Sequence, residues 1–173
     1  WNAVGANYLC EAGKQVAALM YGLKHYGVEP KARSGLLDVY VRISTEMRED
    51  ESVARGVREV LTKMESGEPV LEKELALVRE VSLKGFNENY SLLNVSFEEN
   101  VFDSDLVPAA KKIVEECIRK GIAFKDEGGE TVARLEEHGL PNLVLLRSNN
   151  TTLYSTRDLA LAARHFKEHE FDE

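Results

Sequence analysis

The sequence is poor in the features that mark membrane, disulfide-rich and disordered proteins. No apolar run approaches the ~18 residues of a membrane-spanning helix and no signal peptide precedes the first structured stretch, so a soluble chain is expected. Only two cysteines are present, Cys10 and Cys117, far apart and outside any Cys-x-x-Cys or Cys/His cluster. This usage favours reduced thiols in the cytoplasm and argues against a zinc or other metal site. With 12 glycines and 4 prolines among 173 residues, a collagen-like or disordered chain is also excluded.

The chain also lacks an excess of positive charge. Lys and Arg number 22 against 30 Asp and Glu, a formal net charge of −8, and the acidic excess lies in residues 64–173. Surfaces that bind nucleic acid usually carry a basic patch or stripe. Here basic and acidic residues are interleaved, so this chain alone is a poor candidate for gripping a phosphate backbone. Neither DNA nor a membrane is expected as a partner.

Apolar spacing predicts a largely helical part over residues 1–91 and a mixed α/β part over residues 92–173. Helices are expected around 16–23 (ended by Gly27), along 35–64, from Pro69 towards Asn89, from about Asp105 to Gly121, and over 155–169. Short strands are expected at 93–97, at 122–125 and 131–135 around the turn Asp126-Glu127-Gly128-Gly129, at 143–146 and at 151–154. This order favours an α/β fold with an open sheet.

The most informative segment is Leu153-Tyr154-Ser155-Thr156-Arg157-Asp158-Leu159-Ala160. Tyr154 and Asp158 are four residues apart, so on a helix their side chains project from one face. A phenol ring beside a carboxylate suits a planar cation, because the carboxylate accepts two parallel N–H bonds while the ring offers a flat face. The alternative is structural, since Ser155-x-x-Asp158 also fits a capping box at a helix start.

This segment resembles the Leu-Tyr-x-Thr-Arg-Asp-Leu/Ile-Ala motif of the arginyl-tRNA synthetases, which are class I aminoacyl-tRNA ligases. The resemblance continues at four further places: the strand 143–147, the acidic-Gly hairpin 125–135, the Phe-Asp-…-Glu-Ser-like segment 97–104, and Gly13-Lys14-Gln15. It implies a helical first half packed on a partial Rossmann-type α/β core. The helices between residues 35 and 90 would then be the family's connecting insertion, with a structural role.

The resemblance also implies roles for three residues. The family's Tyr and Asp in the motif bind the substrate arginine, and they fall on Tyr154 and Asp158. The family's Glu before Ser also faces arginine and falls on Asp103, which is one methylene shorter. The alternative for Asp103 is a carboxylate at a helix start. The family's Asn-Asp before Gly-x-Gln appears here as Cys10-Glu11, a second departure from the pattern.

The two ATP-site signatures of class I synthetases, His-Ile-Gly-His and Lys-Met-Ser-Lys, are absent from the sequence; Lys63-Met64-Glu65-Ser66 is a false match on a helical stripe. We therefore expect a fragment of the catalytic domain, a view that the start at Trp1 rather than Met favours. The parent protein would use ATP with magnesium, arginine and tRNA, whereas the fragment alone would bind no cofactor and be inactive. Two alternatives stay open: a stand-alone non-catalytic paralogue that binds a small cationic ligand or a protein, and a purely structural helical domain.

Overall fold

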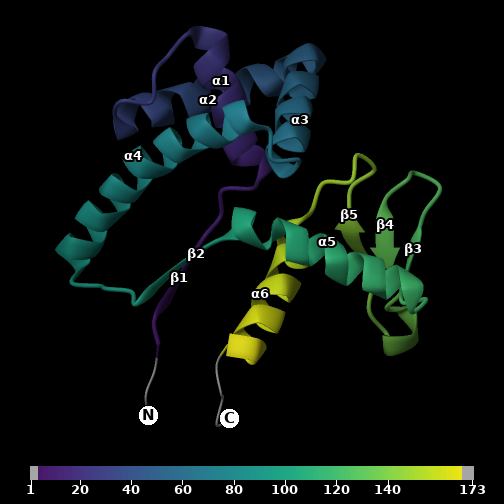
Figure 1. Cartoon of the computed structure of the whole chain (residues 1–173). Helices are drawn as coiled ribbons and strands as arrows, with labels where there is room; N and C mark the ends of the chain where they lie inside the picture. The colour runs from purple at the N-terminus through teal and green to yellow at the C-terminus, as the bar shows by residue number, and fades with distance from the viewer. Residues whose placement is uncertain (1–3, 169–173) are drawn as a thin grey trace. The chain divides into compact units, whose positions relative to one another are not determined.

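The computed structural model describes residues 4–168, which belong to two compact units (Figure 1). The first unit ends at Phe102 and the second begins at Asp103. Among the described residues, none of the helices combines the length and the apolar character that crossing a membrane requires.

The described part of the first unit contains two short strands joined through four helices. Its elements are β1 (Ala6–Leu9), α1 (Lys14–Tyr26), α2 (Arg33–Glu49), α3 (Glu51–Glu65), α4 (Pro69–Leu93) and β2 (Glu99–Phe102). The two strands pair in parallel and lie side by side in Figure 1, with Ala6 opposite Glu99 and Leu9 opposite Phe102. Parallel partners need a long crossover connection. Here the whole helical segment serves as that crossover.

The core of the first unit is built around α1. Ala17 and Ala18 pack against Ile43 of α2 and Val57 of α3, all four of them buried. On a neighbouring face of α1, Met20 and Leu23 pack with apolar residues of α2 and α4. Burial of these small and branched side chains excludes water and supplies most of the stabilisation of such a helical assembly.

The helix boundaries follow local signals in the sequence. Gly27 ends α1 in the left-handed conformation, with φ 64°, as glycine does at many helix ends. Pro69 occupies the first turn of α4. The stretch predicted as one long helix is two, because Asp50 has extended backbone between α2 and α3 and its side chain caps α3.

One strand is misplaced in the prediction. The alternation Leu93-Val95-Phe97 does not mark a strand, because α4 continues to Leu93 and Asn94 caps it with φ 54° in the left-handed region. Leu92 and Leu93 are exposed, so the apolar pattern there does not report a buried sheet face. The strand that forms lies further along the chain, at β2.

The second unit is an antiparallel sheet with two longer helices. Its elements are α5 (Asp103–Arg119), β3 (Ala123–Lys125), β4 (Thr131–Ala133), a short 3₁₀ turn (Glu136–His138), β5 (Leu143–Leu146) and α6 (Tyr154–Glu168). The sheet order is β3-β4-β5, and both pairings are antiparallel. Val114 of α5 packs with Ala123, Ala133 and Leu145 of the sheet in the buried core of this unit.

The mixed α/β class expected from the sequence is confirmed. The hairpin around Asp126–Gly129 and the strand at 143–146 are also confirmed, whereas the segment predicted as a strand at 151–154 makes a single bridge from Thr152 to Leu146. The last helix forms as predicted up to Glu168. Its predicted final residue, His169, lies outside the described residues.

Candidate functional site

The segment from Leu153 to Ala160 forms the start of α6. The carbonyl oxygen of Leu153 accepts hydrogen bonds from the backbone N–H groups of Thr156 (3.2 Å) and Arg157 (3.3 Å), so the helix begins directly after Leu153. Ser155 therefore lies inside the helix rather than in front of it. The capping-box alternative needs Ser155 as the residue before the helix, and it does not describe this helix start.

Tyr154 and Asp158 lie on one face of α6, as their spacing predicts. Both side chains are exposed, Tyr154 to 69% of its maximum. A phenol ring and a carboxylate one turn apart on an exposed helix face are available to a ligand. Their neighbours on the helix, Thr156 and Arg157, are buried. The start of α6 thus presents Tyr154 and Asp158 outward, and Thr156 and Arg157 between them anchor the helix.

Thr156 anchors α6 to the sheet of the second unit. Its Oγ1 donates a hydrogen bond of 2.5 Å to the carbonyl oxygen of Leu145 in β5. The loop before the helix is held as well, because Nη1 of Arg147 donates to the carbonyl oxygen of Thr152 at 2.7 Å. Buried hydroxyl and carbonyl groups satisfied in this way fix a helix start, since breaking these bonds leaves unpaired polar atoms.

Asp103, the third predicted site residue, is the first residue of α5 and is fully buried, with an exposure of 0%. Its Oδ2 lies 3.0 Å from Nε of Arg157 in α6, and the side chain of Arg157 is only 4% exposed. Asp103 therefore also occupies the position of a carboxylate at a helix start, which was the structural alternative for this residue. Arg157 was not among the predicted site residues, and its spacing gave no signal that it points inward, because a residue three positions after Tyr154 lies close to the same helix face.

A second charged contact lies where β1 leads into α1. Glu11, one of the two residues that depart from the family pattern, is 8% exposed and forms a fork with Arg79 of α4. Nε of Arg79 donates to Oε2 of Glu11 at 2.8 Å and Nη2 donates to Oε1. The guanidinium also lies over the ring of Phe102 at the end of β2, 4.2 Å from its centroid. A forked carboxylate contact and an aromatic face together suit a guanidinium group.

This contact lines a cavity of about 380 Å³ in the first unit. Many of its lining residues are apolar residues of α1 and α4, and Cys10, Glu11, Arg79 and Phe102 line it as well. The carboxyl ends of parallel strands are a common place for ligands in α/β folds. The cavity therefore lies near a position where α/β folds often bind ligands. Its two groups that suit a guanidinium, Glu11 and the ring of Phe102, already contact Arg79.

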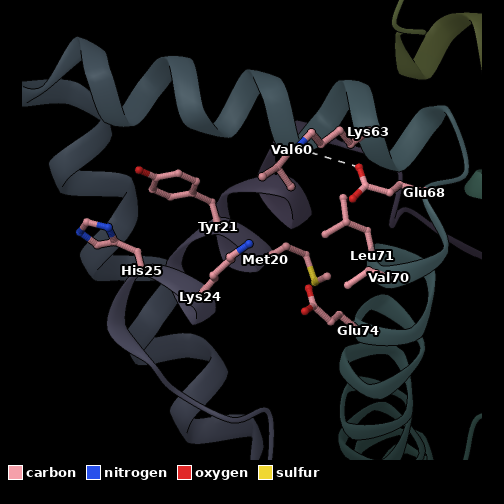
Figure 2. A pocket seen from close by; sticks show the side chains of 10 residues that line it. All are labelled: Met20, Tyr21, Lys24, His25, Val60, Lys63, Glu68, Val70, Leu71 and Glu74. Carbon is pink, nitrogen blue, oxygen red and sulfur yellow. Dashed lines mark ion pairs between the residues drawn. The ribbon is translucent and has the colours of Figure 1, made fainter.

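Figure 2 shows another cavity of the first unit, of about 270 Å³, between α1, α3 and α4. Tyr21, Lys24 and Lys63 lie along its walls, and Lys63 is 4.0 Å from Glu68, a distance at which a surface pair contributes little. None of the predicted site residues lines this cavity. Lys63 and Met64, which belong to the false match to an ATP-site signature, lie on α3. Met64 packs against the core, in agreement with a structural role for this stretch.

Within residues 4–168, no three His, Cys, Asp or Glu side chains gather as a metal site would require. Three arrangements of polar and charged side chains stand out in the described residues: the exposed pair Tyr154 and Asp158, the buried pair Asp103 and Arg157, and the fork of Glu11 and Arg79.

The chain matches the family model of the class I tRNA synthetases (R), catalytic domain, over residues 1–173, and it belongs to this family. Among curated relatives it is similar to the arginine–tRNA ligases of Lactobacillus delbrueckii subsp. bulgaricus (32% identity, 95% of this chain) and Streptococcus pneumoniae (35% identity, 99% of this chain). It spans 30% and 31% of the length of these relatives.

Solved structures agree with the family. The arginyl-tRNA synthetase of Thermus thermophilus superposes with a TM-score of 0.59 at 25% identity, over 93% of this chain and 29% of that one. The enzyme of Plasmodium falciparum superposes with a TM-score of 0.68 at 18% identity, over 95% of this chain and 28% of that one, a likeness of fold alone.

Proposed function

We propose that the protein containing this chain is an arginine–tRNA ligase, and that this chain supplies part of its arginine pocket. Such an enzyme joins arginine to ATP as arginyl-adenylate and then transfers the arginyl group to the terminal ribose of tRNA. The family match along all of residues 1–173 is the observation that carries the proposal. The exposed face of α6 with Tyr154 and Asp158 supports it, because it offers the two groups that a guanidinium needs.

In this proposal the Asp158 carboxylate accepts hydrogen bonds from the guanidinium N–H groups of the substrate. The ring of Tyr154 orients that guanidinium. Asp103 is the second carboxylate that the family resemblance assigns to this pocket. A carboxylate that takes a forked guanidinium discriminates against lysine, which has no planar fork, and against citrulline, which has the shape without the charge. A site built to hydrogen-bond a charged fork rejects a substrate without that fork, because the carboxylate then loses its partner.

ATP with magnesium, and tRNA, are the other expected substrates of the whole protein, and the cytoplasm is its expected location. Neither ATP-site signature occurs in this sequence, and the described residues hold no cluster of metal ligands. We therefore assign no step with ATP or magnesium to the residues of this chain. The 173 residues by themselves are expected to be inactive.

The missing signatures favour one rival function, a non-catalytic paralogue that binds a small cationic ligand or a protein. The test is arginylation of tRNA by the complete reading frame that contains this chain, with tRNA present from the start. Arginine-specific charging supports the ligase, whereas a folded protein that binds arginine without charging tRNA supports the paralogue. A protein that neither charges tRNA nor binds arginine would leave a structural role.

The pocket assignment is tested by Asp158→Asn, which keeps the shape of the side chain and removes its charge. We expect kcat/KM for arginine to fall by about 10- to 100-fold, because a hydrogen bond to a charged group contributes about 1.5–3 kcal/mol. Asp105→Asn is the matched control, since Asp105 is an exposed carboxylate in the first turn of α5. Normal charging by Asp158→Asn would contradict the assignment.

A further inference from the structure

Asp103 and Arg157 form the most deeply buried ion pair of the described residues, with exposures of 0% and 4%. Taking two charges out of water is costly, and the cost is repaid only where geometry and further hydrogen bonds are good. Arg157 has such bonds: its Nη1 donates to Oγ1 of Thr152 at 2.9 Å, and Thr152 is itself buried. The pair is therefore a built part of the second unit rather than a chance surface contact.

The pair joins the segments that determine where the exposed face of α6 lies. Asp103 starts α5, Thr152 belongs to the loop before α6, and Arg157 lies in the first turn of α6. Arg157 directly precedes Asp158 and follows Tyr154 by three positions. A change in the position of its guanidinium thus moves the turn that carries both proposed arginine ligands.

The pair also bears on charge near the proposed pocket. Arg157 and Asp158 are consecutive residues, so a guanidinium released from Asp103 would add a positive charge close in the sequence to the residue proposed to bind the cationic group of the substrate. Asp158 is exposed, and solvent screens such a repulsion, so the main effect expected of the pair is on the position of the helix start.

We infer that Asp103 is a positioning residue that acts on arginine through Arg157, rather than a carboxylate that contacts the substrate. The inference rests on the proposed function and refines the role of one residue in it. A carboxylate with 0% exposure that is paired with Arg157 would have to be uncovered before it could reach a ligand. Uncovering it would disturb the buried pair, which is a costly change.

A double-mutant cycle on arginylation by the complete protein separates the two roles, using Asp103→Asn, Arg157→Gln and the double variant. If Asp103 acts through Arg157, Asp103→Asn raises KM for arginine by about tenfold or more and leaves KM for ATP unchanged. With Arg157→Gln already present, Asp103→Asn then adds less than about twofold. If Asp103 contacts arginine, its effect is the same size in both backgrounds, and that result overturns the inference.

A measurement on the unaltered protein covers the case in which the single variants do not fold. With arginine residues of the protein labelled with ¹⁵N, the hydrogen exchange rate of the Arg157 Nε–H is measured with and without unlabelled arginine as ligand. The Nε–H of Arg157 is buried beside Asp103 and is expected to exchange slowly, and the inference requires that the ligand does not accelerate it. Faster exchange by about tenfold or more with arginine bound would mean that Asp103 turns to the substrate, and would overturn the inference.

The two proposals fail in different ways. If the unaltered protein does not charge tRNA with arginine, the proposed ligase is wrong. If it charges tRNA and the cycle is additive, the ligase stands and the positioning role of Asp103 is wrong.

Discussion

Glu11–Arg79 in the first unit and Asp103–Arg157 in the second both join a carboxylate that follows a strand in the sequence to an arginine on a later helix. They differ in burial. The side chain of Arg79 is 32% exposed and borders a cavity, whereas that of Arg157 is 4% exposed and its partner is completely buried. If Glu11 and Arg79 separate, water can reach their charged groups. If Asp103 and Arg157 separate, their surroundings still exclude water. The same chemistry is therefore expected to give an adaptable contact in one unit and a fixed one in the other.

The largest expected effect comes from breaking the buried pair. Arg157→Ala leaves the Asp103 carboxylate buried without its guanidinium, so we expect the second unit to lose about 3–5 kcal/mol of stability. The measurement is hydrogen exchange of backbone amides in α5 and α6, which should accelerate by about 100-fold or more.

Arg164→Ala is the matched control on the same helix. Arg164 pairs with Glu168 at 2.8 Å, but 36% and 48% of the two side chains are exposed to solvent, so we expect a loss of less than about 1 kcal/mol. Equal losses for Arg157→Ala and Arg164→Ala would mean that burial does not decide the strength of these pairs.

A smaller effect is expected from Arg79→Ala in the first unit. The variant removes the fork to Glu11 and the contact with the Phe102 ring, but Glu11 can regain water through the cavity. We therefore expect a loss of about 1–2 kcal/mol, measured by urea denaturation and by hydrogen exchange in α1 and α4.

Arg79→Lys sharpens this comparison, because it keeps the charge and loses the planar fork. We expect it to recover less than half of the lost stability, since lysine neither forks on a carboxylate nor stacks as well on a ring. Full recovery by lysine would show that the contact is a simple charge attraction. A loss for Arg79→Ala as large as that for Arg157→Ala would break the comparison between the two pairs.

Local signals in the sequence predicted much of the fold and the outward face of the site. Gly27, Pro69 and the Gly128-Gly129 turn are positions where backbone geometry favours one residue type, and each lies where it was predicted. The spacing of Tyr154 and Asp158 likewise placed them on one exposed helix face.

Contacts between distant segments left no such signal. Asp103 meets Arg157 and Glu11 meets Arg79 only because helices far apart in the sequence pack together, and nothing near either carboxylate indicates its partner. The misplaced strand after Leu93 has a different cause. Exposed apolar residues at the end of α4 produced an alternation typical of a strand. Whether such residues are buried depends on tertiary packing, which their spacing in the sequence does not report.

The smallest expected effect concerns Asp50, a fully exposed carboxylate that can be compared with Glu11 and Asp103. Asp50 caps α3: its Oδ1 accepts a hydrogen bond of 2.7 Å from the backbone N–H of Ser52 and another from the Ser52 hydroxyl. These bonds lower the pKa of Asp50 from its ordinary value, first through the Ser52 side chain and then through its backbone N–H. A carboxylate whose pKa is lower in the folded state stabilises the fold above its unfolded pKa, and this contribution disappears as pH falls through the folded pKa.

Asp50→Ala should therefore lower the urea midpoint of the first unit slightly at pH 6, and by less as pH falls below the unfolded pKa towards the lower folded pKa. Asp50→Asn is the matched variant, because asparagine also caps helices but does not titrate in this range. The difference between aspartate and asparagine should shrink as pH falls from 6 to 3. If that difference stayed constant, the charge of Asp50 would contribute nothing to the cap, and burial alone would rank the three carboxylates.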